Sequence, residues 1–422
     1  MYLRSIEPLI VDLLSEFRII YLTGPRQSGK STLVRFIAEQ TGMDYITLDN
    51  QAMLAAVQND PHGFIQSLGH RKIVLDEFQY APQLILAVKE ASDALSPEEK
   101  GKFILTGSAD IFRSAKAQEA LPGHMARLEL YPLALGELNS PSKNIIDYLV
   151  EGHYQSEKTP LIKREVLANM VLQGGYPEVQ TKSPRAKQLW FRSYLEGRLW
   201  KDFETLYAAR GDYHSKLQAL VPYLAGLSGN LLKYAHVAND LGLDDKVVRA
   251  YIEILDLMFI VKRLPAYLKN KAKRQATTLP KLQMVDTGLA CYLLGLHTDA
   301  QLLVSHYYGG LLENFLVMEF CKQATWSINT VELYHFRNAR KKEVDLVLEQ
   351  SNGQIIGIEI KASSSVNSAD FNGLACLAEF AGTRFAHGVL FYSGQEVLPF
   401  TVGERRFYAL PIGLLLNSLA SN

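Results

Sequence analysis

The chain has 422 residues, a length that predicts two to four domains rather than a single core. Hydrophobic residues make up 48% and charged residues 21%, which is typical of globular proteins and excludes a fibrous or disordered chain. Lysine plus arginine and aspartate plus glutamate both number 44, so the formal net charge is zero. This balance gives no whole-chain argument for a nucleic-acid partner, although local basic patches are compatible with it.

Cysteine usage and hydropathy indicate the compartment. Cys291, Cys321 and Cys376 form no close pair, so we expect free thiols in a reducing cytosol rather than disulfides or a zinc site. The first apolar stretch contains Asp12 and Glu16, unlike the core of a secretory signal peptide. Nowhere do about 18 apolar residues follow one another, so the sequence predicts no membrane-spanning segment. The sequence therefore predicts a cytoplasmic protein with no membrane partner.

The first 135 residues alternate short apolar runs with amphipathic stretches. This alternation predicts an α/β fold with a parallel sheet covered by helices. The expected strands are Arg18–Thr23, Tyr45–Leu48, Arg71–Asp76, Lys102–Thr106 and Ala126–Leu130.

The rest of the chain changes character twice. Up to about Tyr213 the periodicity is helical, and we expect its aromatic residues to pack as helix core anchors. Asn230–Pro265 has the pattern of a helix-turn-helix followed by a strand. From about Tyr307 the pattern predicts a helix, then strands, a second helix and further strands. The expected core aromatics are Trp190, Phe191, Tyr194 and Trp200, and the expected later strands are Val331–Phe336, Val344–Glu349 and Ile355–Ile360.

A phosphate-binding pattern follows the first strand. Gly24–Thr32 reads GPRQSGKST and fits G-x-x-x-x-G-K-[ST], between an apolar strand and an amphipathic helix. Glycines allow the backbone to curl so that its N–H groups and the helix N-terminus face a phosphate. We expect Lys30 to reach the β- and γ-phosphates of ATP and Ser31 to bind Mg²⁺. The expected nucleotide-binding residues are Gly24, Arg26, Gln27, Ser28, Gly29, Lys30, Ser31 and Thr32.

Two later strands are expected to complete this site. Lys72–Glu77 predicts a buried strand ending in two carboxylates, with Asp76 suited to Mg²⁺ and Glu77 to activating water as a general base. A strand ending in small polar groups would aim Thr106 or Ser108 at the γ-phosphate or the lytic water. Each motif has an alternative interpretation. The phosphate loop could be a chance match in a glycine-containing turn, and the Asp76–Glu77 pair could be a solvated strand end. Thr106 or Ser108 could instead cap a helix.

Together these motifs resemble a prokaryotic family of AAA+-type ATPases with a C-terminal domain similar to restriction endonucleases, and the resemblance spans nearly the whole chain. It implies an AAA+-type P-loop domain over residues 1–135, a helical lid over 136–215, a winged-helix domain over 216–290 and a restriction-endonuclease-like α/β domain over 300–422. The segments that carry the resemblance are Gly24–Leu33, Leu75–Pro82, Leu105–Ser108, Leu130–Leu133, Gly174–Glu178, Val285–Leu289 and Gly309–Lys361. Gly174–Glu178 most simply forms a rigid turn between helices.

One position departs from the family pattern. His124 follows Leu121–Gly123, where family members usually carry an arginine. If that arginine contacts the γ-phosphate, either hydrolysis is slow in this protein or the role passes to Arg127 or Arg113. AAA+ resemblance implies oligomers, and His124 weakens an argument from an arginine shared between subunits.

The middle of the chain carries a local excess of basic residues. The second helix of the helix-turn-helix is expected to present Lys246 and Arg249 outward, which suits contacts with a phosphate backbone. DNA is therefore the expected partner, and a module for packing, oligomerisation or protein binding is the alternative. The further basic residues are Lys262, Arg263, Lys269, Lys271, Lys273 and Arg274.

The last part of the chain places acidic residues on a predicted hairpin. Asp345 begins one strand at the open end of the hairpin, and Glu359 and Lys361 share one face of the partner strand because alternate residues point the same way. With Glu313 from the preceding helix, or less favourably Glu319, they resemble the D…E-x-K metal site of restriction-endonuclease-like folds, apart from Val344 where a proline is usual. Such a set would hold Mg²⁺ and polarise a water against a phosphodiester, with Lys361 acting as a catalytic residue rather than as a ligand. The alternatives are a charged hairpin edge or a nuclease-like scaffold kept as a binding module.

These inferences combine into one expectation. ATP and Mg²⁺ bind at the first domain, ATP is hydrolysed, and the nucleotide state controls a winged-helix and nuclease-like module that acts on DNA. One alternative is a nucleotide-gated, non-enzymatic regulator that binds DNA or protein through an inactive nuclease-like domain. Another is an ATPase that remodels a protein and never meets DNA.

Overall fold

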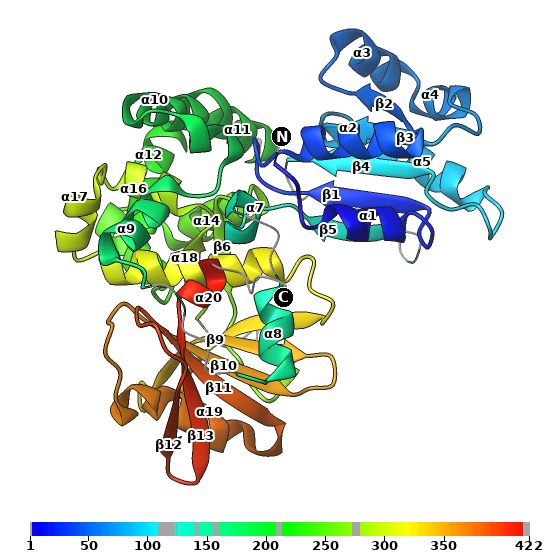
Figure 1. The fold of residues 1–422 in the computed structure, drawn as a ribbon. Helices are drawn as coiled ribbons and strands as arrows, with labels where there is room; N and C mark the ends of the chain where they lie inside the picture. Colours follow the sequence, from blue (N-terminus) through cyan, green and yellow to red (C-terminus); the bar gives the residue numbers. More distant parts are fainter. Residues whose placement is uncertain are drawn as a thin grey trace. The chain divides into compact units, whose positions relative to one another are not determined.

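The computed structural model describes residues 2–108, 123, 125–139, 143–154, 159, 161–207, 213–271 and 279–416. The chain forms two compact units, shown in Figure 1. The first comprises Met1–Leu133 with Leu257–Phe259, and the second comprises Ala134–Asp256 with Ile260–Asn422.

The first unit is built on a five-stranded sheet in the order β2-β3-β4-β1-β5. Every pairing in it is parallel, which confirms the expected α/β sheet. The strands are β1 (Ile19–Thr23), β2 (Asp44–Thr47), β3 (Ile73–Asp76), β4 (Phe103–Gly107) and β5 (Met125–Glu129). The helices are α1 (Glu7–Leu13), α2 (Lys30–Thr41), α3 (Gln51–Asn59), α4 (Pro61–Ser67) and α5 (Leu84–Asp93), with a 3₁₀ turn η1 (Phe78–Tyr80).

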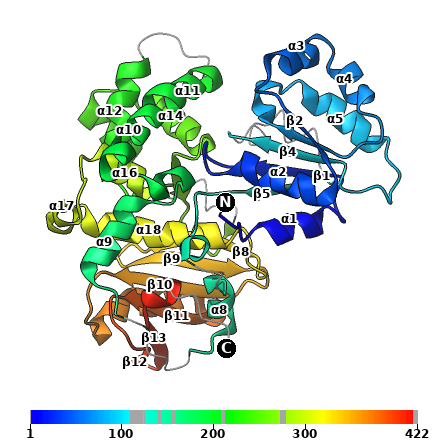
Figure 2. The same cartoon turned by 45° about the horizontal axis from the view of Figure 1, so that its top comes forward.

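Both faces of this sheet are covered, and for that reason its central strands are apolar at nearly every position. Tyr21, Leu75 and Leu105 face a core that includes Ile65 of α4 and Val88 of α5. Figure 2 shows α1 and α2 on the opposite face. The carboxyl ends of β1, β3 and β4 therefore meet at one edge between two helical layers, which is where ligands bind in open α/β sheets.

The second unit begins with helices, in agreement with the helical periodicity of that region. Its predicted aromatic anchors are buried, and the rings of Trp190 and Tyr194 stack with centroids 5.4 Å apart. The elements are α7 (Leu135–Asn139), α8 (Ile145–Glu151), α9 (Arg164–Gln173), η3 (Pro177–Thr181), α10 (Pro184–Tyr194), the π-helical η4 (Leu195–Leu199), α11 (Trp200–Tyr207), α12 (Tyr213–Gly226), α16 (Thr287–Leu293) and α17 (Asp299–Val304).

The predicted helix-turn-helix is present as two helices, α13 (Tyr234–Leu241) and α14 (Asp245–Leu257). The turn between them begins at Gly242, which adopts a left-handed conformation. The strands β6 (Val261–Leu264) and β7 (Lys281–Met284) follow and pair antiparallel. The identification of this segment as a winged-helix domain stays a prediction.

A six-stranded mixed sheet ends the second unit, in the order β12-β13-β11-β10-β9-β8. The predicted hairpin is confirmed, because β9 and β10 pair antiparallel, whereas β10 and β11 are parallel. The strands are β8 (Val331–Arg337), β9 (Glu343–Gln350), β10 (Ile355–Lys361), β11 (Phe385–Tyr392), β12 (Leu398–Val402) and β13 (Arg405–Pro411). The helical elements are α18 (Tyr308–Gln323), η6 (Ser368–Phe371), α19 (Asn372–Ala381), η7 (Gly382–Arg384) and α20 (Gly413–Leu416).

Helices α18 and α19 cover opposite faces of this sheet. Phe391 of β11 packs against Phe320 of α18 with ring centroids 5.7 Å apart, whereas its neighbour Leu390 belongs to the core formed with α19. Gly357 of β10 is required by the approach of α19, because a Cβ there would lie 2.7 Å from a methyl group of Leu374. The central strands β10 and β11 are thus covered by helices on both faces of the sheet.

The break between the units follows Leu133, close to the predicted boundary after residue 135. The predicted division of the remaining chain into three domains stays a prediction, since the second unit is one compact body. None of the three cysteines, all of which lie among the described residues, forms a disulfide. None of the helices in the described part of the chain combines the length and the hydropathy of a membrane span.

Candidate nucleotide-binding site

The predicted phosphate loop connects β1 to α2, and two of its glycines are structurally required. A Cβ on Gly24 would lie 2.1 Å from the carbonyl oxygen of Leu130. Gly29 precedes α2 with φ of 95°, in the left-handed region that favours glycine. The loop therefore has the tight curvature that lets backbone amides face an anion at the start of a helix.

Lys30 is the first residue of α2, and its side chain lies inside the loop. It is 6% exposed, and its Nζ donates hydrogen bonds to the carbonyl oxygens of Gly24 (2.9 Å) and Pro25 (2.8 Å). Burial lowers the pKa of Lys30 to about 8, although the carboxylates of Glu77 and Asp76 oppose this shift. An incompletely neutralised ammonium is thus held where the pattern places the β- and γ-phosphates.

A buried arginine, which the sequence did not point to, holds the phosphate loop in place through hydrogen bonds. The guanidinium of Arg4 donates to the carbonyl oxygen of Ser28 (2.6 Å) and to that of Tyr131 (2.7 Å). It fixes the loop to the segment that follows β5. Within the loop, Arg26 donates to the Tyr80 hydroxyl at 2.9 Å.

Asp76 lies at the carboxyl end of β3, where the sequence placed it, and is 2% exposed. Its carboxylate accepts hydrogen bonds from the hydroxyls of Thr106 and Tyr45. Burial, followed by the bond to Asp76, raises the pKa of Tyr45 to about 12, and Arg35 lies over the Tyr45 ring at 4.5 Å. Tyr45 therefore acts as a donor that orients Asp76, a role not foreseen from the sequence.

The structure corrects the orientation expected for Thr106. We expected its hydroxyl to face the γ-phosphate or the lytic water, but it donates to Asp76 instead. The same oxygen accepts the backbone N–H of Glu77 at 3.2 Å. Thr106 thus ties the end of β4 to the acidic pair at the end of β3.

Glu77 follows Asp76 in a left-handed backbone conformation, with φ of 59°. Such a conformation costs a non-glycine residue about 1 kcal/mol or more and is frequently found at functional sites. The Glu77 carboxylate accepts a hydrogen bond from the side-chain amide of Gln79. The side-chain oxygen of Gln79 in turn accepts the backbone N–H of Ser108 at 3.2 Å. Gln79, also missed by the sequence reasoning, links Glu77 to the predicted Ser108.

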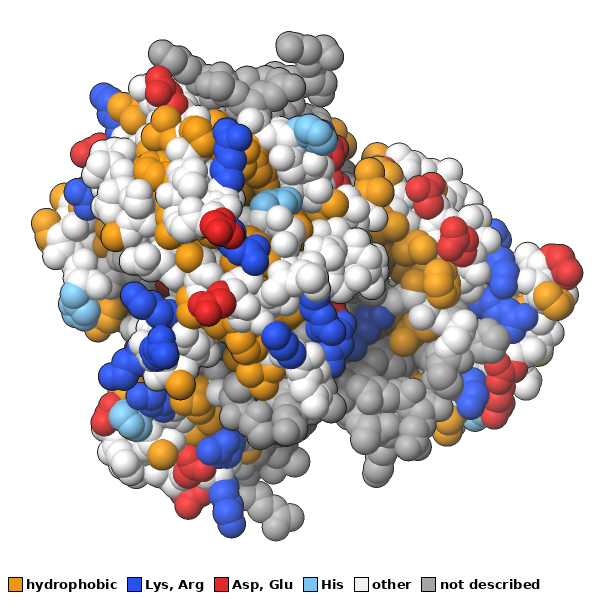
Figure 3. All heavy atoms as spheres, turned by 90° about the horizontal axis from the view of Figure 1, so that it is seen from below, with side chains coloured by type: hydrophobic (Ala, Val, Ile, Leu, Met, Phe, Trp, Pro, Cys, Tyr) orange, Lys and Arg blue, Asp and Glu red, His pale blue; other side chains and the backbone are white. Residues whose placement is uncertain are grey.

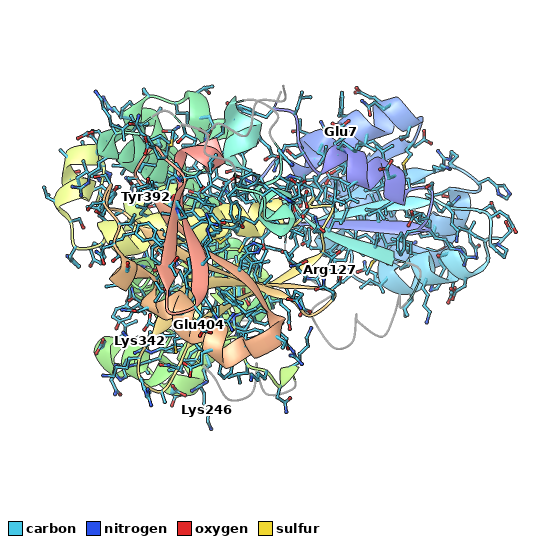
Figure 4. The ribbon with its side chains drawn as sticks, turned by 60° about the horizontal axis from the view of Figure 1, so that its bottom comes forward. Glu7, Arg127, Lys246, Lys342, Tyr392 and Glu404 are labelled. Carbon is cyan, nitrogen blue, oxygen red and sulfur yellow. The ribbon has the colours of Figure 1, made fainter. Side chains whose placement is uncertain are left out.

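The arginine candidates are less closely tied to this site. Arg127 lies in the middle of β5, opposite Tyr21 of β1, and its Nη2 is 3.8 Å from a carboxylate oxygen of Glu129 on its own strand (Figure 4). Arg113 and His124 lie outside the described residues. A role for Arg127 at the γ-phosphate stays a prediction.

The second predicted site does bring its carboxylates together, at the start of β9 and the end of β10. Asp345 accepts the backbone N–H of Ile360 at 3.0 Å and shares a hydrogen bond with the Glu359 carboxyl. An unpredicted residue, Lys281 of β7, enters this group. Its Nζ lies 2.7 Å from Glu313 Oε1 and 3.0 Å from Asp345 Oδ1.

This arrangement does not fit the predicted Mg²⁺. The ammonium of Lys281 stands between Glu313 and Asp345, where a bridging cation would have to lie. Among the described residues, no group of three or more His, Cys, Asp or Glu side chains is arranged to hold a metal ion. The carboxylates are instead neutralised by an internal amine and by protons. Burial and the charge of Asp345 raise the pKa of Glu313 to about 8 and that of Glu359 well above its ordinary value.

Two further residues of the predicted metal site also have other partners. Lys361 forms an ion pair with Asp370 of η6, although it shares a strand face with Glu359. Glu319, the alternative ligand, is fully buried and accepts the backbone N–H of Leu135 at 2.9 Å. It therefore connects α18 to the first residue of α7, which is a structural role.

The basic region around the helix-turn-helix is partly neutralised within the fold. Lys246 and Arg249 are exposed, as predicted, but Arg249 pairs with Asp245 at 2.6 Å. Arg263 pairs with Asp256 at 3.1 Å. Lys273 and Arg274 lie outside the described residues. Figure 3 shows both lysine or arginine and aspartate or glutamate side chains on the face that it draws.

Comparison with known proteins agrees with the geometry of the first unit. Residues 16–139 match the family described as an AAA domain. These residues form an AAA-type P-loop domain. Two other segments, 164–300 and 308–415, match domains of unknown function (DUF8612 and DUF4143), whose descriptions name no activity. The AAA domain is thus the part of the chain for which a family match carries a functional implication.

The relatives of the whole chain name no activity either. An uncharacterized protein of Mycobacterium bovis and one of Mycobacterium tuberculosis are each 27% identical over 349 residues, which cover 82% of this chain and 71% of theirs. A Walker-type ATPase of Pyrococcus abyssi is 14% identical, with 69% of this chain and 96% of the other covered, at a TM-score of 0.42. The ORC2 protein of Aeropyrum pernix is 12% identical, with 76% and 93% covered, at 0.33.

Proposed function

We propose that this protein binds ATP with Mg²⁺ in its AAA domain and hydrolyses it. The observation that carries the proposal is the buried Lys30 ammonium, held only by backbone carbonyls within a phosphate loop and beside Asp76 and Glu77. A triphosphate supplies the negative charge that these carbonyls lack. Lys30 binds its β- and γ-phosphates, and the loop amides orient it.

Asp76 and Glu77 have different roles in this proposal. Bound Mg²⁺ would supply charge neutralisation at the phosphates, and Ser31 with Asp76 would hold it. Thr106 and Tyr45 donate to Asp76 and fix the direction of its carboxylate, as outer partners of metal ligands usually do. Glu77, oriented by Gln79, takes a proton from the attacking water as a general base.

Hydrolysis is tested by Glu77→Gln in the full chain. The variant keeps the size and hydrogen-bonding shape of the side chain but cannot accept the proton, so phosphate release should fall strongly while ATP still binds. Glu90→Gln, an exposed glutamate on α5, makes the same chemical change away from the site and should leave phosphate release unaltered. Hydrolysis by Glu77→Gln at the rate of the unaltered protein would refute the proposed base.

We further propose that the second unit responds to the nucleotide as a binding module for DNA or a protein partner, rather than as a nuclease. Lys281 supports this version, because it occupies the place between Glu313 and Asp345 that a catalytic metal would need. Exposed Lys246 on α14 is available for phosphate contacts and is labelled in Figure 4.

The two versions separate in one experiment. A DNA mobility shift that weakens with salt and changes with ATP, without Mg²⁺- or Mn²⁺-dependent nicking, supports the binding module. Nicking that is lost in Asp345→Ala would restore the nuclease. The absence of any shift would favour a protein partner or remodelling of a protein.

A further inference from the structure

A hollow of about 520 Å³ lies in the second unit, apart from the carboxylate group around Lys281. One wall is the segment that leads into α9, and the other is formed by the chain just beyond β10 and β11. The lining residues are Leu161, Ile162, Lys163, Arg164, Ala362, Ser363, Ser364 and Ser393. None of them is acidic, and its volume is typical of small-molecule sites, which measure about 300–1,000 Å³.

The charge of the hollow comes from the start of α9. Lys163 is the N-cap residue and Arg164 the first residue of this ten-residue helix, and both are exposed. No side chain caps the helix, so the partial positive charge of its first turn adds to that of the two side chains, and Glu165 in the same turn offsets part of this charge. Arg164 is held in place by the ring of Tyr308, 5.5 Å from its guanidinium carbon.

Hydroxyl groups line the opposite wall. Ser393 follows Tyr392 at the end of β11, the residue labelled in Figure 4, and its backbone N–H donates to the carbonyl oxygen of Ser363 at 3.0 Å. The Ser393 side chain is only 5% exposed, yet its Oγ has no hydrogen-bond partner among the described residues. A buried hydroxyl without a partner costs free energy, and such groups call for a ligand or water.

The two walls are joined by backbone contacts rather than by chance proximity. The N–H of Thr159, just before the helix approach, donates to the carbonyl oxygen of Gln395 at 3.0 Å, two residues after Ser393. Two cations and a helix N-terminus therefore lie on one wall of the hollow, and the Ser393 hydroxyl lies on the other. This set of groups matches an oxyanion.

We propose that this hollow binds a phosphate group. Lys163, Arg164 and the first-turn amides of α9 neutralise the phosphate oxygens, and Ser393 Oγ–H donates to one of them. The volume leaves room for the remainder of a phosphorylated molecule along the apolar side chains of Leu161 and Ile162. The site is separate from the phosphate loop of the AAA domain and requires no nucleotide there.

The test uses the full chain with Lys30→Ala, so that the phosphate loop contributes little to anion binding. Inorganic phosphate is titrated by calorimetry into this protein and into the same protein with Lys163→Gln and Arg164→Gln. Both side chains are exposed, so the changes should not impair folding. We expect the affinity to fall about tenfold or more. Ser393→Ala should produce a smaller loss without lowering the melting temperature, since the hydroxyl that it removes has no partner among the described residues.

The matched control is Lys341→Gln with Lys342→Gln, an adjacent exposed pair immediately before β9 that changes the net charge equally. Phosphate affinity should remain that of the parent. The proposal is overturned if phosphate does not bind, or if the control pair weakens binding as much as the Lys163 and Arg164 pair does. The source of the phosphate is then identified with two ligands, a mononucleotide and a 5′-phosphorylated oligonucleotide. The affinity of each is compared with that of its unphosphorylated form, and the ligand whose phosphate adds more affinity is the better match.

Discussion

Thr106 donates its hydroxyl to Asp76 and accepts the backbone N–H of Glu77, so one side chain at the end of β4 positions both acidic residues at the end of β3. Neighbouring parallel strands make this possible, since Leu75 and Leu105 are paired in register immediately before these residues. The acidic pair is thus fixed relative to the phosphate loop by the sheet itself.

Thr106→Val should slow ATP hydrolysis about tenfold to a hundredfold while changing ATP affinity little, because it removes the donor to Asp76 but keeps the shape of the side chain. Steady-state phosphate release and nucleotide titration measure the two effects. Thr41→Val, which removes a hydroxyl bonded only to the preceding helical turn, serves as the control. Equal hydrolysis rates in Thr106→Val and the unaltered protein would show that the hydroxyl has no such role.

Lys30 should take up a proton when ATP binds near pH 8. Its pKa is about 8 before binding, and the negative phosphates must raise it, so affinity is highest below pH 8 and falls as the pH rises through and beyond that value. Calorimetry at pH 8 in two buffers with different heats of ionisation measures the uptake directly. Observed heats that do not depend on the buffer, after correction for the titration of ATP itself, would contradict this prediction.

The carboxylate group around Lys281 should make the stability of the second unit depend on pH. The pKa of Glu313 is raised from 4.5 to about 8 by burial and by Asp345, so its contribution to stability is fully present below about pH 4.5. That contribution is lost as the pH rises toward 8. Glu313→Gln should remove much of this slope. All three tryptophans, Trp190, Trp200 and Trp326, belong to this unit, so thermal unfolding followed by their fluorescence reports on it.

Asp286 connects two sequence motifs that lie more than 100 residues apart. Its carboxylate accepts the backbone N–H of Gly175 at 2.7 Å and that of Leu289, at the start of α16, at 2.9 Å. Asp286→Ala should lower the free energy of unfolding by about 2–4 kcal/mol, because it removes a helix cap and leaves a buried N–H without a partner. Chemical denaturation followed by fluorescence measures the loss. Asp299→Ala, at the exposed start of α17, should cost far less.

Local patterns predicted the phosphate loop, the parallel sheet and the β9–β10 hairpin, because each depends on residues close together in the chain. The partners that orient the site could not be found in this way. Tyr45 and Arg4 reach Asp76 and Ser28 from other segments, and their residue types carry no motif. Gln79 is only two residues from Glu77, but its role depends on the left-handed turn at Glu77, which no propensity predicts.

At the carboxylate group around Lys281, the sequence predicted the strand positions but not the partners of the side chains. Strand alternation correctly placed Glu359 and Lys361 on one face, yet it could not show that Lys361 pairs with Asp370 or that Lys281 enters from β7. In the helix-turn-helix, the spacing of Asp245 and Arg249 by four residues was a usable signal of neutralisation. Net charge counted along the sequence overlooked it.

The central claim is that Lys30 and the loop around it bind a triphosphate together with Mg²⁺. Calorimetric titration of ATP and Mg²⁺ into the folded full chain, beside the Lys30→Ala variant, tests it most directly. We predict saturable binding to the unaltered protein and an affinity at least about a hundredfold lower in Lys30→Ala. No binding to the unaltered protein, or equal affinity in the two proteins, would contradict the account.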